Sequence, residues 1–444
     1  MRLSTLVALL PGSRNHGDVE IRSVSINTRT LQPGDIFIAI AGENHDGHDF
    51  IKQAEQQGAI GLIISKPIKT ELPYVIVTDT RQALGVLATE HRKKFAIPII
   101  ALTGSSGKTT VKNMIASILQ QLGNTLATQG NYNNDIGTPL TLLRLTAEHE
   151  YAVIELGANH VGEIAYTVQL VKPDVALITN VAPAHLEGFG SIENIAAAKA
   201  EIYSGLTKSG TAIVNVDDKF ADFWLSHIQN KTVMRFGLNH DSEVTATFSH
   251  MHDHVYPVFI LRTPKGEIEI TCPLPGRHQL YNVMAAAAAT EAVGASLPQI
   301  KTGIEAVQQT AGRLRILQSS HGRTIVDDAY NANPGSVAVA IDTLVQFPGQ
   351  HILVLGDLAE LGPTAAEHMK QIGSYAKQRG IHQLYCCGQL SVHASESFGH
   401  GAQHFSDQQK LINYLKTQCP TEAVILIKGS RSAAMENVVK ALVD

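Results

Sequence analysis

Residues 97–110 read Ile-Pro-Ile-Ile-Ala-Leu-Thr-Gly-Ser-Ser-Gly-Lys-Thr-Thr, and the fold can be predicted from this stretch. It begins with an apolar run rich in β-branched side chains, which predicts a buried strand. A glycine-rich turn follows, and apolar residues then recur at helical spacing from Val111 to Leu122. Strand, turn and helix in this order form a phosphate-binding arrangement, because backbone N–H groups and the positive end of the helix dipole face the turn.

The turn predicts a nucleotide site with a metal ion. Lys108 would lie against the β- and γ-phosphates, and Thr109 would offer its hydroxyl group to Mg²⁺. Leu102 stands where the full pattern, G-x-x-x-x-G-K-[ST], has its first glycine, so the motif reduces to T-G-x-x-G-K-T. The alternative interpretation is a tight turn that only opens a helix. The residues expected to contact the nucleotide are Thr103, Gly104, Ser105, Ser106, Gly107, Lys108, Thr109 and Thr110.

Length, charge and cysteine content exclude several classes of protein. A chain of 444 residues, 44% hydrophobic and 17% charged, predicts a globular protein of roughly two to four domains. A net charge of −5 argues against a nucleic-acid partner. The four cysteines show no Cys-x-x-Cys spacing and are interpreted as small core residues in a reducing compartment. No apolar run approaches the ~18 residues of a membrane span and no signal-peptide cleavage site is found, so we expect a cytoplasmic protein without membrane insertion.

Strand and helix patterns divide the chain into three segments, residues 1–95, 96–312 and 313–444. The first segment alternates short strands with helices, and the last holds four expected strands separated by helices. This alternation predicts α/β domains, and a mostly parallel sheet in the last segment, because right-handed crossovers join strands of that kind. From about residue 231 to 275 the pattern changes to short strands, with a hairpin expected near 263–266.

Polar residues follow the strands of the central segment at positions where parallel sheets bind ligands. Glu155 belongs to the strand pattern at 152–157, and His185 follows the next strand, at 174–180. The carboxyl ends of parallel strands lie at one edge of the sheet, so both side chains are expected to face the same nucleotide-metal site as Lys108. A single histidine after a strand is otherwise interpreted as a structural residue.

Lys199 lies on the apolar face of a helix predicted at 191–207. Ile192, Ile195, Lys199 and Ile202 share one helix face, because they are spaced i, i+3, i+7 and i+10. A desolvated lysine has a lowered pKa and keeps more neutral amine, which can react with CO₂ to form a carbamate, an oxygen ligand for Mg²⁺. The alternative is a lysine whose stem packs while its amine reaches water, and the residues alone favour that alternative.

Further polar stretches are candidate ligand-binding loops. Arg29 is a candidate for binding a phosphate or carboxylate through its planar guanidinium group. Residues 42–50 form a cluster rich in Asp, Gly and His, for which spacing alone favours a loop and a helix cap. Residues 130–139 are too rich in glycine and asparagine for a helix or strand, and their amides suit either a polar ligand or a structured turn.

These motifs, taken in order along the whole chain, resemble the Mur ligase family. The resemblance is carried by the T-G-x-x-G-K-T-T loop, Gly-Asn-x-Asn-Asn-x-Ile-Gly-x-Pro at 130–139, Glu155-Leu-Gly, Ala-His185, the helix with Lys199, and Gly-Arg313-Leu. Gln279 departs from the usual His-Asn-x-x-Asn motif of the family, so only Asn282 is carried over from it.

Within the family, three stretches look most like the branch that adds D-alanyl-D-alanine to UDP-N-acetylmuramoyl-tripeptide. They are Thr28-Arg29, the run at 42–50, and Asp-Ala-Tyr-Asn-Ala-Asn-Pro at 328–334. The first of them follows Asn27, where the family often has aspartate. The sister branch that adds the third amino acid normally carries an Asp-Asn-Pro-Arg signature, which this sequence lacks.

The resemblance implies a fold, a reaction and cofactors. The fold would have a small UDP-sugar-binding α/β domain (1–95), a central ATP-binding domain with a parallel sheet (96–312), and a C-terminal Rossmann-like domain for the incoming dipeptide (313–444). The reaction would be ATP-dependent amide-bond formation through an acyl phosphate, with ATP and Mg²⁺ as cofactors and a pentapeptide cell-wall precursor as product. UDP-N-acetylmuramoyl-tripeptide and D-alanyl-D-alanine are the expected small-molecule partners of a monomer.

The resemblance also implies roles for individual residues. The catalytic set is Lys108, Glu155, His185, Lys199 and Arg313. The metal ligands are Thr109, Glu155, His185 and a carbamate on Lys199. Further nucleotide contacts are Asn282, Arg313 and Asp328. Substrate contacts are Thr28, Arg29, Asp46 and His48 for the UDP-sugar, Asn134 for the peptide, and Tyr330, Asn331 and Asn333 for the dipeptide.

Three other functions stay open at this point. A sister Mur ligase would add a single amino acid in place of a dipeptide. A folylpolyglutamate synthetase shares the central and last domains but should lack the segment at 1–95. A regulatory protein with a phosphate loop would bind a nucleoside triphosphate and change partners with little turnover.

Overall fold

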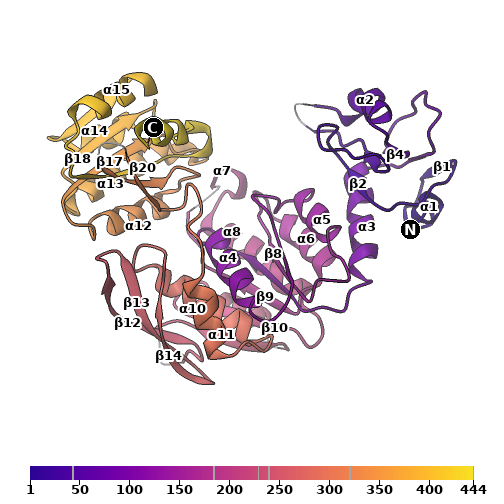
Figure 1. Cartoon of the computed structure of the whole chain (residues 1–444), viewed down its shortest axis with the longest axis horizontal. Coiled ribbons are helices and arrows are strands. Elements are labelled where there is room, and N and C mark those ends of the chain that lie inside the picture. Colours follow the sequence, from indigo (N-terminus) through magenta and orange to yellow (C-terminus); the bar gives the residue numbers. More distant parts are fainter. Residues whose placement is uncertain (43–44, 184–185, 229, 239–240, 320–321, 444) are drawn as a thin grey trace.

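The computed structural model of the chain describes residues 1–42, 45–183, 186–228, 230–238, 241–319 and 322–443. In this described part the strands form four sheets, distributed over three bodies (Figure 1). The first and last bodies lie at opposite ends of the molecule, and the central body lies between them. The α/β class predicted from the sequence is confirmed. The domain boundaries near residues 95 and 312 stay a prediction.

The first body holds a five-stranded sheet in the order β1-β5-β4-β3-β2, in which only β1 runs antiparallel to its neighbour. Its strands are β1 (Arg14–His16), β2 (Val24–Ser25), β3 (Ile36–Ile38), β4 (Gly61–Ile64) and β5 (Tyr74–Ile76). Its helices are α1 (Leu3–Leu9), α2 (Ile51–Gln56) and α3 (Thr80–Arg92). Arg81 of α3 forms an ion pair with Asp135 (2.9 Å), so this body is joined to the central one by more than the chain alone.

The central body is built on six parallel strands in the order β11-β10-β9-β6-β8-β7. The strands are β6 (Ile99–Thr103), β7 (Thr125–Ala127), β8 (Tyr151–Glu155), β9 (Val175–Ile178), β10 (Thr211–Asn215) and β11 (Thr232–Phe236). The helices are α4 (Lys108–Leu119), α5 (Gly137–Leu142), α6 (Glu163–Val171), α7 (Leu186–Phe189), α8 (Ile192–Ala200), α9 (Ala221–His227), α10 (Gln279–Glu291) and α11 (Leu297–Glu305). β6 lies inside the sheet, so the loop that follows it opens near the middle of the carboxyl edge.

The two faces of this sheet bury alternate residues of each strand. Ile100 and Leu102 of β6 pack on the face covered by α4, α10 and α11. Ile99 and Ala101 pack on the opposite face, which α6 covers. Because successive side chains of a strand point to opposite faces, a fully apolar strand of this kind requires helices on both sides.

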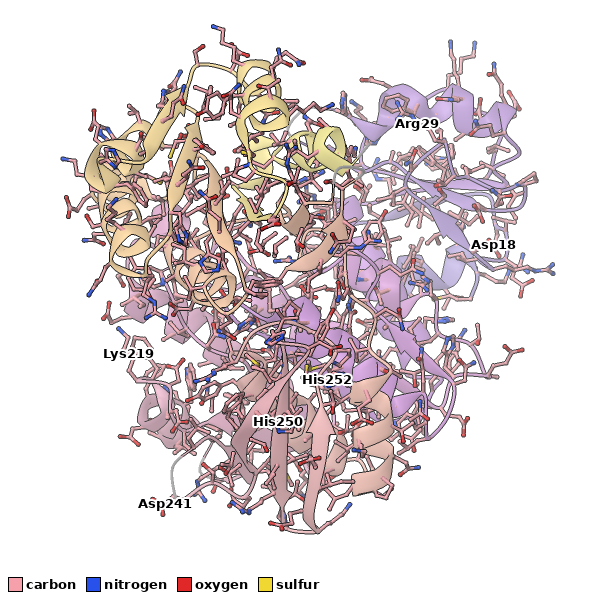
Figure 2. All side chains as sticks on the ribbon, turned by 60° about the vertical axis from the view of Figure 1, so that its left-hand side comes forward. Asp18, Arg29, Lys219, Asp241, His250 and His252 are labelled. Atoms are coloured by element: carbon pink, nitrogen blue, oxygen red, sulfur yellow. The ribbon has the colours of Figure 1, made fainter. Side chains whose placement is uncertain are left out.

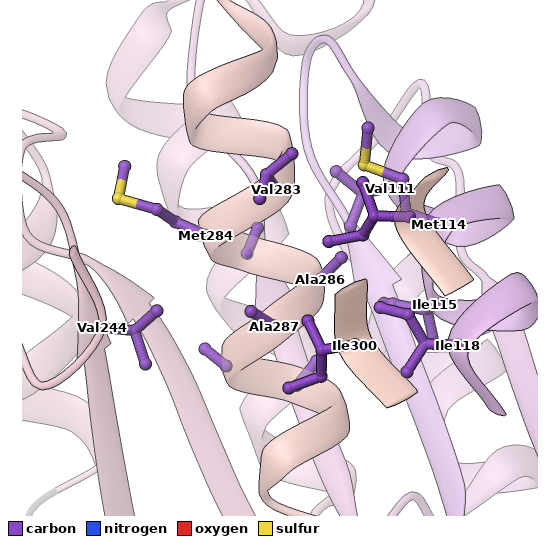
Figure 3. Packing of buried hydrophobic residues seen from close by; sticks show 14 of the residues in the cluster. Val111, Met114, Ile115, Ile118, Val244, Val283, Met284, Ala286, Ala287 and Ile300 are labelled. Atoms are coloured by element: carbon purple, nitrogen blue, oxygen red, sulfur yellow. The ribbon is translucent and has the colours of Figure 1, made fainter. Parts of the chain in front are cut away.

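Small side chains let α10 approach α4 closely. The alanines at 285–289 are all fully buried, and Figure 3 shows α10 between Val244 on one side and the α4 residues Val111, Met114 and Ile115 on the other. Alanine adds little bulk at a helix contact and has the highest helix propensity. The position of α4, and with it the phosphate loop, is therefore fixed by a close, apolar helix contact.

A three-stranded antiparallel sheet extends the central body below the last one (Figure 1). Its strands are β12 (Thr245–His252), β13 (Tyr256–Thr263) and β14 (Gly266–Thr271). Thr263 pairs with Gly266 across the turn, which confirms the predicted hairpin.

The last body holds six strands in the order β15-β16-β20-β17-β18-β19, parallel except for β15. The strands are β15 (Arg315–Gln318), β16 (Thr324–Asp328), β17 (Gln350–Gly356), β18 (Gln383–Cys387), β19 (Ala402–Phe405) and β20 (Ala423–Lys428). The helices are α12 (Pro334–Leu344), α13 (Ala365–Gln378), α14 (Val392–Phe398), α15 (Gln408–Gln418) and α16 (Glu436–Val443). The mostly parallel sheet is confirmed.

Three elements of the last body were not predicted from the sequence: β15, α14 and β19. The strands β15 and β19 lie at the edges of the sheet and are short and partly polar, so their apolar pattern in the sequence is weak. The helix predicted at 191–207 is shorter than expected, because α8 gives way to a 3₁₀ turn at Glu201–Gly205. Within the described ranges, no helix has the length and apolar character needed to cross a membrane.

Replacing Gly303 of α11 by alanine should destabilise the central body. A Cβ atom there would lie 2.4 Å from the Ile118 Cα of α4, so one helix would have to move. Overpacking costs about 1–3 kcal/mol, which calorimetry should record as a fall of several degrees in the unfolding temperature. The exposed neighbour Thr302→Ala is the control. An unchanged unfolding temperature for Gly303→Ala would mean that α11 does not hold α4 in place.

Candidate functional site

The phosphate loop connects β6 to α4, and the end of β9 holds its shape. Ser105 N donates to Asn180 O (2.9 Å), Ser106 N donates to Asn180 Oδ1 (3.0 Å), and Asn180 Nδ2 donates back to Ser106 O (3.1 Å). Gly104 has a φ of +155°, and a Cβ atom there would lie 1.8 Å from Thr179 Oγ1. The loop therefore has a fixed shape that requires glycine at its first position.

The first turn of α4 is open to an anion. Gly107 is the N-cap residue of α4 and has a φ of +81°. It has no side chain that could accept a hydrogen bond from the first turn, so the N–H groups of that turn face the loop. A Cβ atom on Gly107 would lie 2.7 Å from Asn282 Oδ1, which places the amide of Asn282 directly beside the loop. These features fit a bound phosphate, because the N–H groups of the first turn and the positive end of the helix dipole favour an anion.

Lys108 bends back over the loop that it follows. Its Nζ donates to Gly104 O (2.7 Å). Burial lowers the pKa of Lys108, the charge of Glu155 raises it, and the charge of Arg313 lowers it further. Lys108 therefore lies within electrostatic range of Glu155 and of Arg313, two further predicted residues.

Thr109 and Glu155 bring two oxygen donors together at the edge of the sheet. Thr109 Oγ1 donates to Glu155 Oε2 (3.1 Å), and Glu155 is buried at the end of β8. Hydroxyl and carboxylate oxygens are ligands that Mg²⁺ prefers, so this pair fits the predicted metal. Among the residues with described positions, no group of three His, Cys, Asp or Glu side chains is arranged to hold a metal ion. The predicted ligand His185 lies outside the described residues.

Lys199 is buried in α8, with only 4% of its surface exposed. Burial lowers its pKa well below the usual value, and the positive charge of Lys108 lowers it further. The helix begins at the predicted N-cap, since Ser191 Oγ accepts a hydrogen bond from Asn194 N (3.1 Å). The environment favours the neutral amine from which a carbamate can form, while the carbamate itself stays a prediction.

A cavity of about 890 Å³ lies between the central and last bodies. Both bodies contribute predicted residues to its lining, and Asn333 Nδ2 of the last body donates to Ser106 Oγ of the phosphate loop (3.4 Å). The predicted residues that line it are Ser105, Ser106, Gly107, Lys108, Thr109, Thr110, Asn282, Arg313, Asp328, Asn331 and Asn333. The structure thus brings most of the predicted nucleotide contacts to one place.

Asp328 is paired with a buried lysine that the sequence analysis did not assign to the site. Lys428 Nζ lies 2.5 Å from Asp328 Oδ2 and also donates to Asn331 O (3.0 Å). Burial raises the pKa of Asp328 and lowers that of Lys428, and the attraction between the two charges opposes both shifts. A lysine at the end of the otherwise apolar β20 was the available signal for Lys428.

Arg313 is attached to the last body. Its Cζ lies 4.2 Å from the centre of the Tyr330 ring. On either side of it, Gly312 N donates to Asp327 Oδ2 (2.8 Å) and Leu314 N donates to Asp328 Oδ1 (3.2 Å). Tyr330 therefore packs against a predicted nucleotide contact, and its role toward a dipeptide stays a prediction.

The chain just before Gly312 is attached to the central body instead. Asn113 Nδ2 of α4 donates to Thr310 Oγ1 (3.0 Å). Only Ala311 separates Thr310 from Gly312, which has a φ of +71°. The junction between the two bodies is therefore short.

Asp46 and His48 form a closed network within the first body. Asp46 accepts from Lys66 Nζ (2.6 Å) and from His48 Nδ1 (2.6 Å), and the hydrogen bond from Lys66 contributes most to a pKa of Asp46 far below its usual value. His48 is buried, and its Nε2 accepts from Ser65 N (3.0 Å). Both ring nitrogens of His48 thus have protein partners.

Thr28 and Arg29 also belong to the first body. Thr28 is buried and its Oγ1 donates to Gln53 Oε1 (3.0 Å), whereas the side chain of Arg29 is exposed (Figure 2). Neither residue lines the cavity, and the same holds for Asp46 and His48. The assignment of these four residues to a UDP-sugar stays a prediction.

The sequence predicts a ligand-binding role for Asn134 but none for Asn180. Asn134, predicted near the peptide, accepts from Gly137 N through its Oδ1 (2.8 Å) and so holds the start of α5. For Asn180, which shapes the phosphate loop, the sequence predicts only the end of a strand. Its position directly after an apolar run was the available signal.

The chain matches models of the Mur ligase family along most of its length. The matches are "Mur ligase family, catalytic domain" over residues 20–98, "Mur ligase middle domain" over 102–290, and "Mur ligase, glutamate ligase domain" over 312–431. The chain is 48% identical over 443 residues to the UDP-N-acetylmuramoyl-tripeptide--D-alanyl-D-alanine ligase of Escherichia coli (strain K12), covering 99% of this chain and 98% of the relative.

Two solved structures are similar over nearly the whole chain. MurF from Acinetobacter baumannii superposes with a TM-score of 0.91 at 38% identity, covering 96% of this chain and 94% of that one. MurF ligase from Thermotoga maritima, solved in complex with ADP, superposes with a TM-score of 0.85 at 26% identity, covering 95% and 97%.

His278, which lines the cavity, should make stability depend on pH. Burial lowers the pKa of His278 to about 4, from an ordinary value near 6.5. Between these values the unfolded chain binds a proton that the folded chain does not, so stability should fall as pH drops from about 6.5 to 4, by at most ~1.4 kcal/mol per unit. His278→Gln should show a flatter profile in thermal unfolding.

The control for this measurement is His250, which is exposed on β12 (Figure 2). His250→Gln should follow the natural chain, because its side chain meets solvent in both states. Parallel profiles for His278→Gln and the natural chain would contradict the prediction.

Proposed function

The chain belongs to the Mur ligase family, and we propose that within this family it joins D-alanyl-D-alanine to UDP-N-acetylmuramoyl-tripeptide at the expense of ATP. The proposal is carried by one observation: the phosphate loop with Thr109 and the last-body residues Arg313 and Asp328 line a single cavity, and Thr109 Oγ1 also donates to Glu155 Oε2 (3.1 Å). It is supported by relatives with this printed activity that match the whole chain, including the first body, which a folylpolyglutamate synthetase should lack.

The reaction has two steps, because a carboxylate has no good leaving group. First, a carboxylate oxygen of the tripeptide attacks the γ-phosphorus of ATP, the bond to ADP breaks, and an acyl phosphate forms. Then the amine nitrogen of D-alanyl-D-alanine attacks the acyl carbon, the amine loses a proton, and phosphate leaves with the bonding electrons. The products are the pentapeptide precursor, ADP and phosphate.

The residues expected to contact the nucleotide and the metal, in the central and last bodies, mainly position the substrates and neutralise charge. Lys108 holds the β- and γ-phosphates, and Asn282, Arg313 and Asp328 contact the rest of the nucleotide. Thr109 and Glu155 would hold one Mg²⁺, and Glu155, His185 and a carbamate on Lys199 would hold a second. Magnesium, when bound, neutralises the charge that develops on the transferred phosphoryl group.

The remaining predicted contacts belong to the ends of the two acceptor substrates. Thr28, Arg29, Asp46 and His48 would hold the UDP-sugar, and Asn134 the peptide. Tyr330, Asn331 and Asn333 would hold the dipeptide. We expect segments 1–95, 96–312 and 313–444 to act as the three domains of a monomer in the cytoplasm, where ATP is present. Size-exclusion chromatography with light scattering would contradict the monomer by showing a dimer.

Phosphate release should require both acceptor substrates. With ATP, Mg²⁺ and UDP-N-acetylmuramoyl-tripeptide present, omission of D-alanyl-D-alanine should abolish product formation, because the acyl phosphate then has no amine to react with. Free D-alanine in place of the dipeptide is the control that separates a sister ligase. Steady phosphate release that ignores the dipeptide would contradict the proposal and favour a nucleotide-binding protein of another kind.

Lys199→Ala should lower phosphate release by at least about tenfold, because it removes an expected metal ligand. Added acetate or formate should restore part of the activity by supplying a carboxylate in the vacated space. Lys208→Ala, at an exposed position nearby in the sequence, is the control. Full activity of Lys199→Ala would remove the carbamate from the metal site and leave the ligase reaction untouched.

A further inference from the structure

The protein itself holds both oxygens of the Glu155 carboxylate, from two different elements. Thr109 Oγ1 of α4 donates to Oε2 (3.1 Å), and Asn133 Nδ2 donates to Oε1 (2.9 Å). Asn133 belongs to the loop between β7 and α5, on the other side of the strand end from the phosphate loop. The carboxylate is therefore held on two sides.

Asn133 is in turn held in a defined position. Its backbone O accepts from Gly157 N (2.8 Å), and its backbone N donates to Asn131 O (2.7 Å). A Cβ atom on Gly157 would lie 2.8 Å from Asn133 Oδ1 and 3.0 Å from its Nδ2. Gly157 thus leaves the space that the amide of Asn133 needs in order to reach Glu155.

The backbone of Glu155 is fixed by a second connection to α4. Glu155 N donates to Thr128 Oγ1 (3.0 Å), and Thr128 O accepts from Nζ of the buried Lys112 (2.8 Å). With the backbone fixed in this way, the free motion left to Glu155 is rotation of its side chain. Asn133 restricts that rotation.

We propose that Asn133 is a positioning residue that orients the Glu155 carboxylate for magnesium, an inference that rests on the proposed function, in which Glu155 is a metal ligand. A neutral amide suits this task, since it donates a charge-assisted hydrogen bond without offering a competing charge to the metal. Hydrogen-bond partners of metal ligands commonly contribute tenfold or more to metal affinity. The neighbouring Asn134 does not share the task, because its Oδ1 holds the start of α5.

Two substitutions separate hydrogen bonding from packing. Asn133→Leu keeps a side chain of similar shape against Gly157 but removes the donor, whereas Asn133→Ala removes both. The matched control is Asn131→Ala, an exposed asparagine in the same loop. The measurement is the affinity for Mn²⁺ in the presence of ADP, read from the electron paramagnetic resonance signal of free Mn²⁺, so that no turnover is needed.

Both Asn133 variants should bind Mn²⁺ about tenfold more weakly than the natural chain, with unfolding temperatures within about 2 °C of it. In the ligase assay they should require more Mg²⁺ and show a lower kcat, at an unchanged KM for D-alanyl-D-alanine. Normal Mn²⁺ affinity in Asn133→Leu would overturn the proposal, as would an equal loss in Asn131→Ala.

The experiment also separates this inference from the proposed function. If the natural chain showed no dipeptide-dependent phosphate release, the ligase assignment would fail. The Mn²⁺ affinities of the Asn133 variants would still show whether Asn133 supports Glu155 as a metal ligand. If either Asn133→Leu or Asn133→Ala fails to fold, the Mn²⁺ affinity of the other variant tests the proposal, because each substitution removes the Nδ2 donor to Glu155.

Discussion

The register between β6 and β8 is the constraint on which the site depends. Leu102 lies opposite Glu155 in the parallel pair, so the phosphate loop and the carboxylate leave the sheet side by side. A slip of one residue would turn Glu155 to the other face of the sheet and separate it from Thr109. The buried, apolar faces of both strands prevent such a slip, because it would move the core residues of β8 from one face of the sheet to the other.

The packing behind the sheet has a similar effect on the nucleotide site. The alanines of α10 let this helix lie close to α4, and the same helix carries Asn282 to within contact of Gly107. The contact between α10 and α4 thus fixes both the position at which α4 begins and the position of the Asn282 amide beside it. Stability and the expected ligand binding therefore depend on the same residues on the central side of the site.

Much of the fold could be predicted because its signals are local. The strand, loop and helix at 97–110, the N-cap Ser191 and the hairpin at Thr263 all depend on residues close together in the sequence. The edge strands β15 and β19 could not be predicted, because polar edge strands lack an apolar pattern and are defined by their partners. Lys199 could be predicted only in part. Its spacing places it on the apolar face of a helix, but only the fold shows that its amine is buried.

The same limit applied to the site. The phosphate loop and Glu155 could be predicted because each lies at the end of an apolar strand pattern. The roles of Asn133, Asn180 and Lys428 could not, because the residues that they contact are far away in the sequence. Nothing in the run Asn133-Asn134 tells which asparagine reaches Glu155 and which holds a helix. That division depends on the absent side chain of Gly157 and on the direction in which the chain enters α5.

The short junction at Ala311 limits how the two bodies can move. Thr310 is bound to α4 and Gly312 to Asp327, while Gln309 Oε1 accepts a hydrogen bond from Ile316 N of β15 across the same junction (2.9 Å). Arg313 follows this junction directly, and Arg313 and Arg431 both face the ring of Tyr330, with their Cζ atoms 4.2 Å and 5.8 Å from its centre. Any displacement of the last body would therefore carry both arginines toward or away from the phosphate loop together.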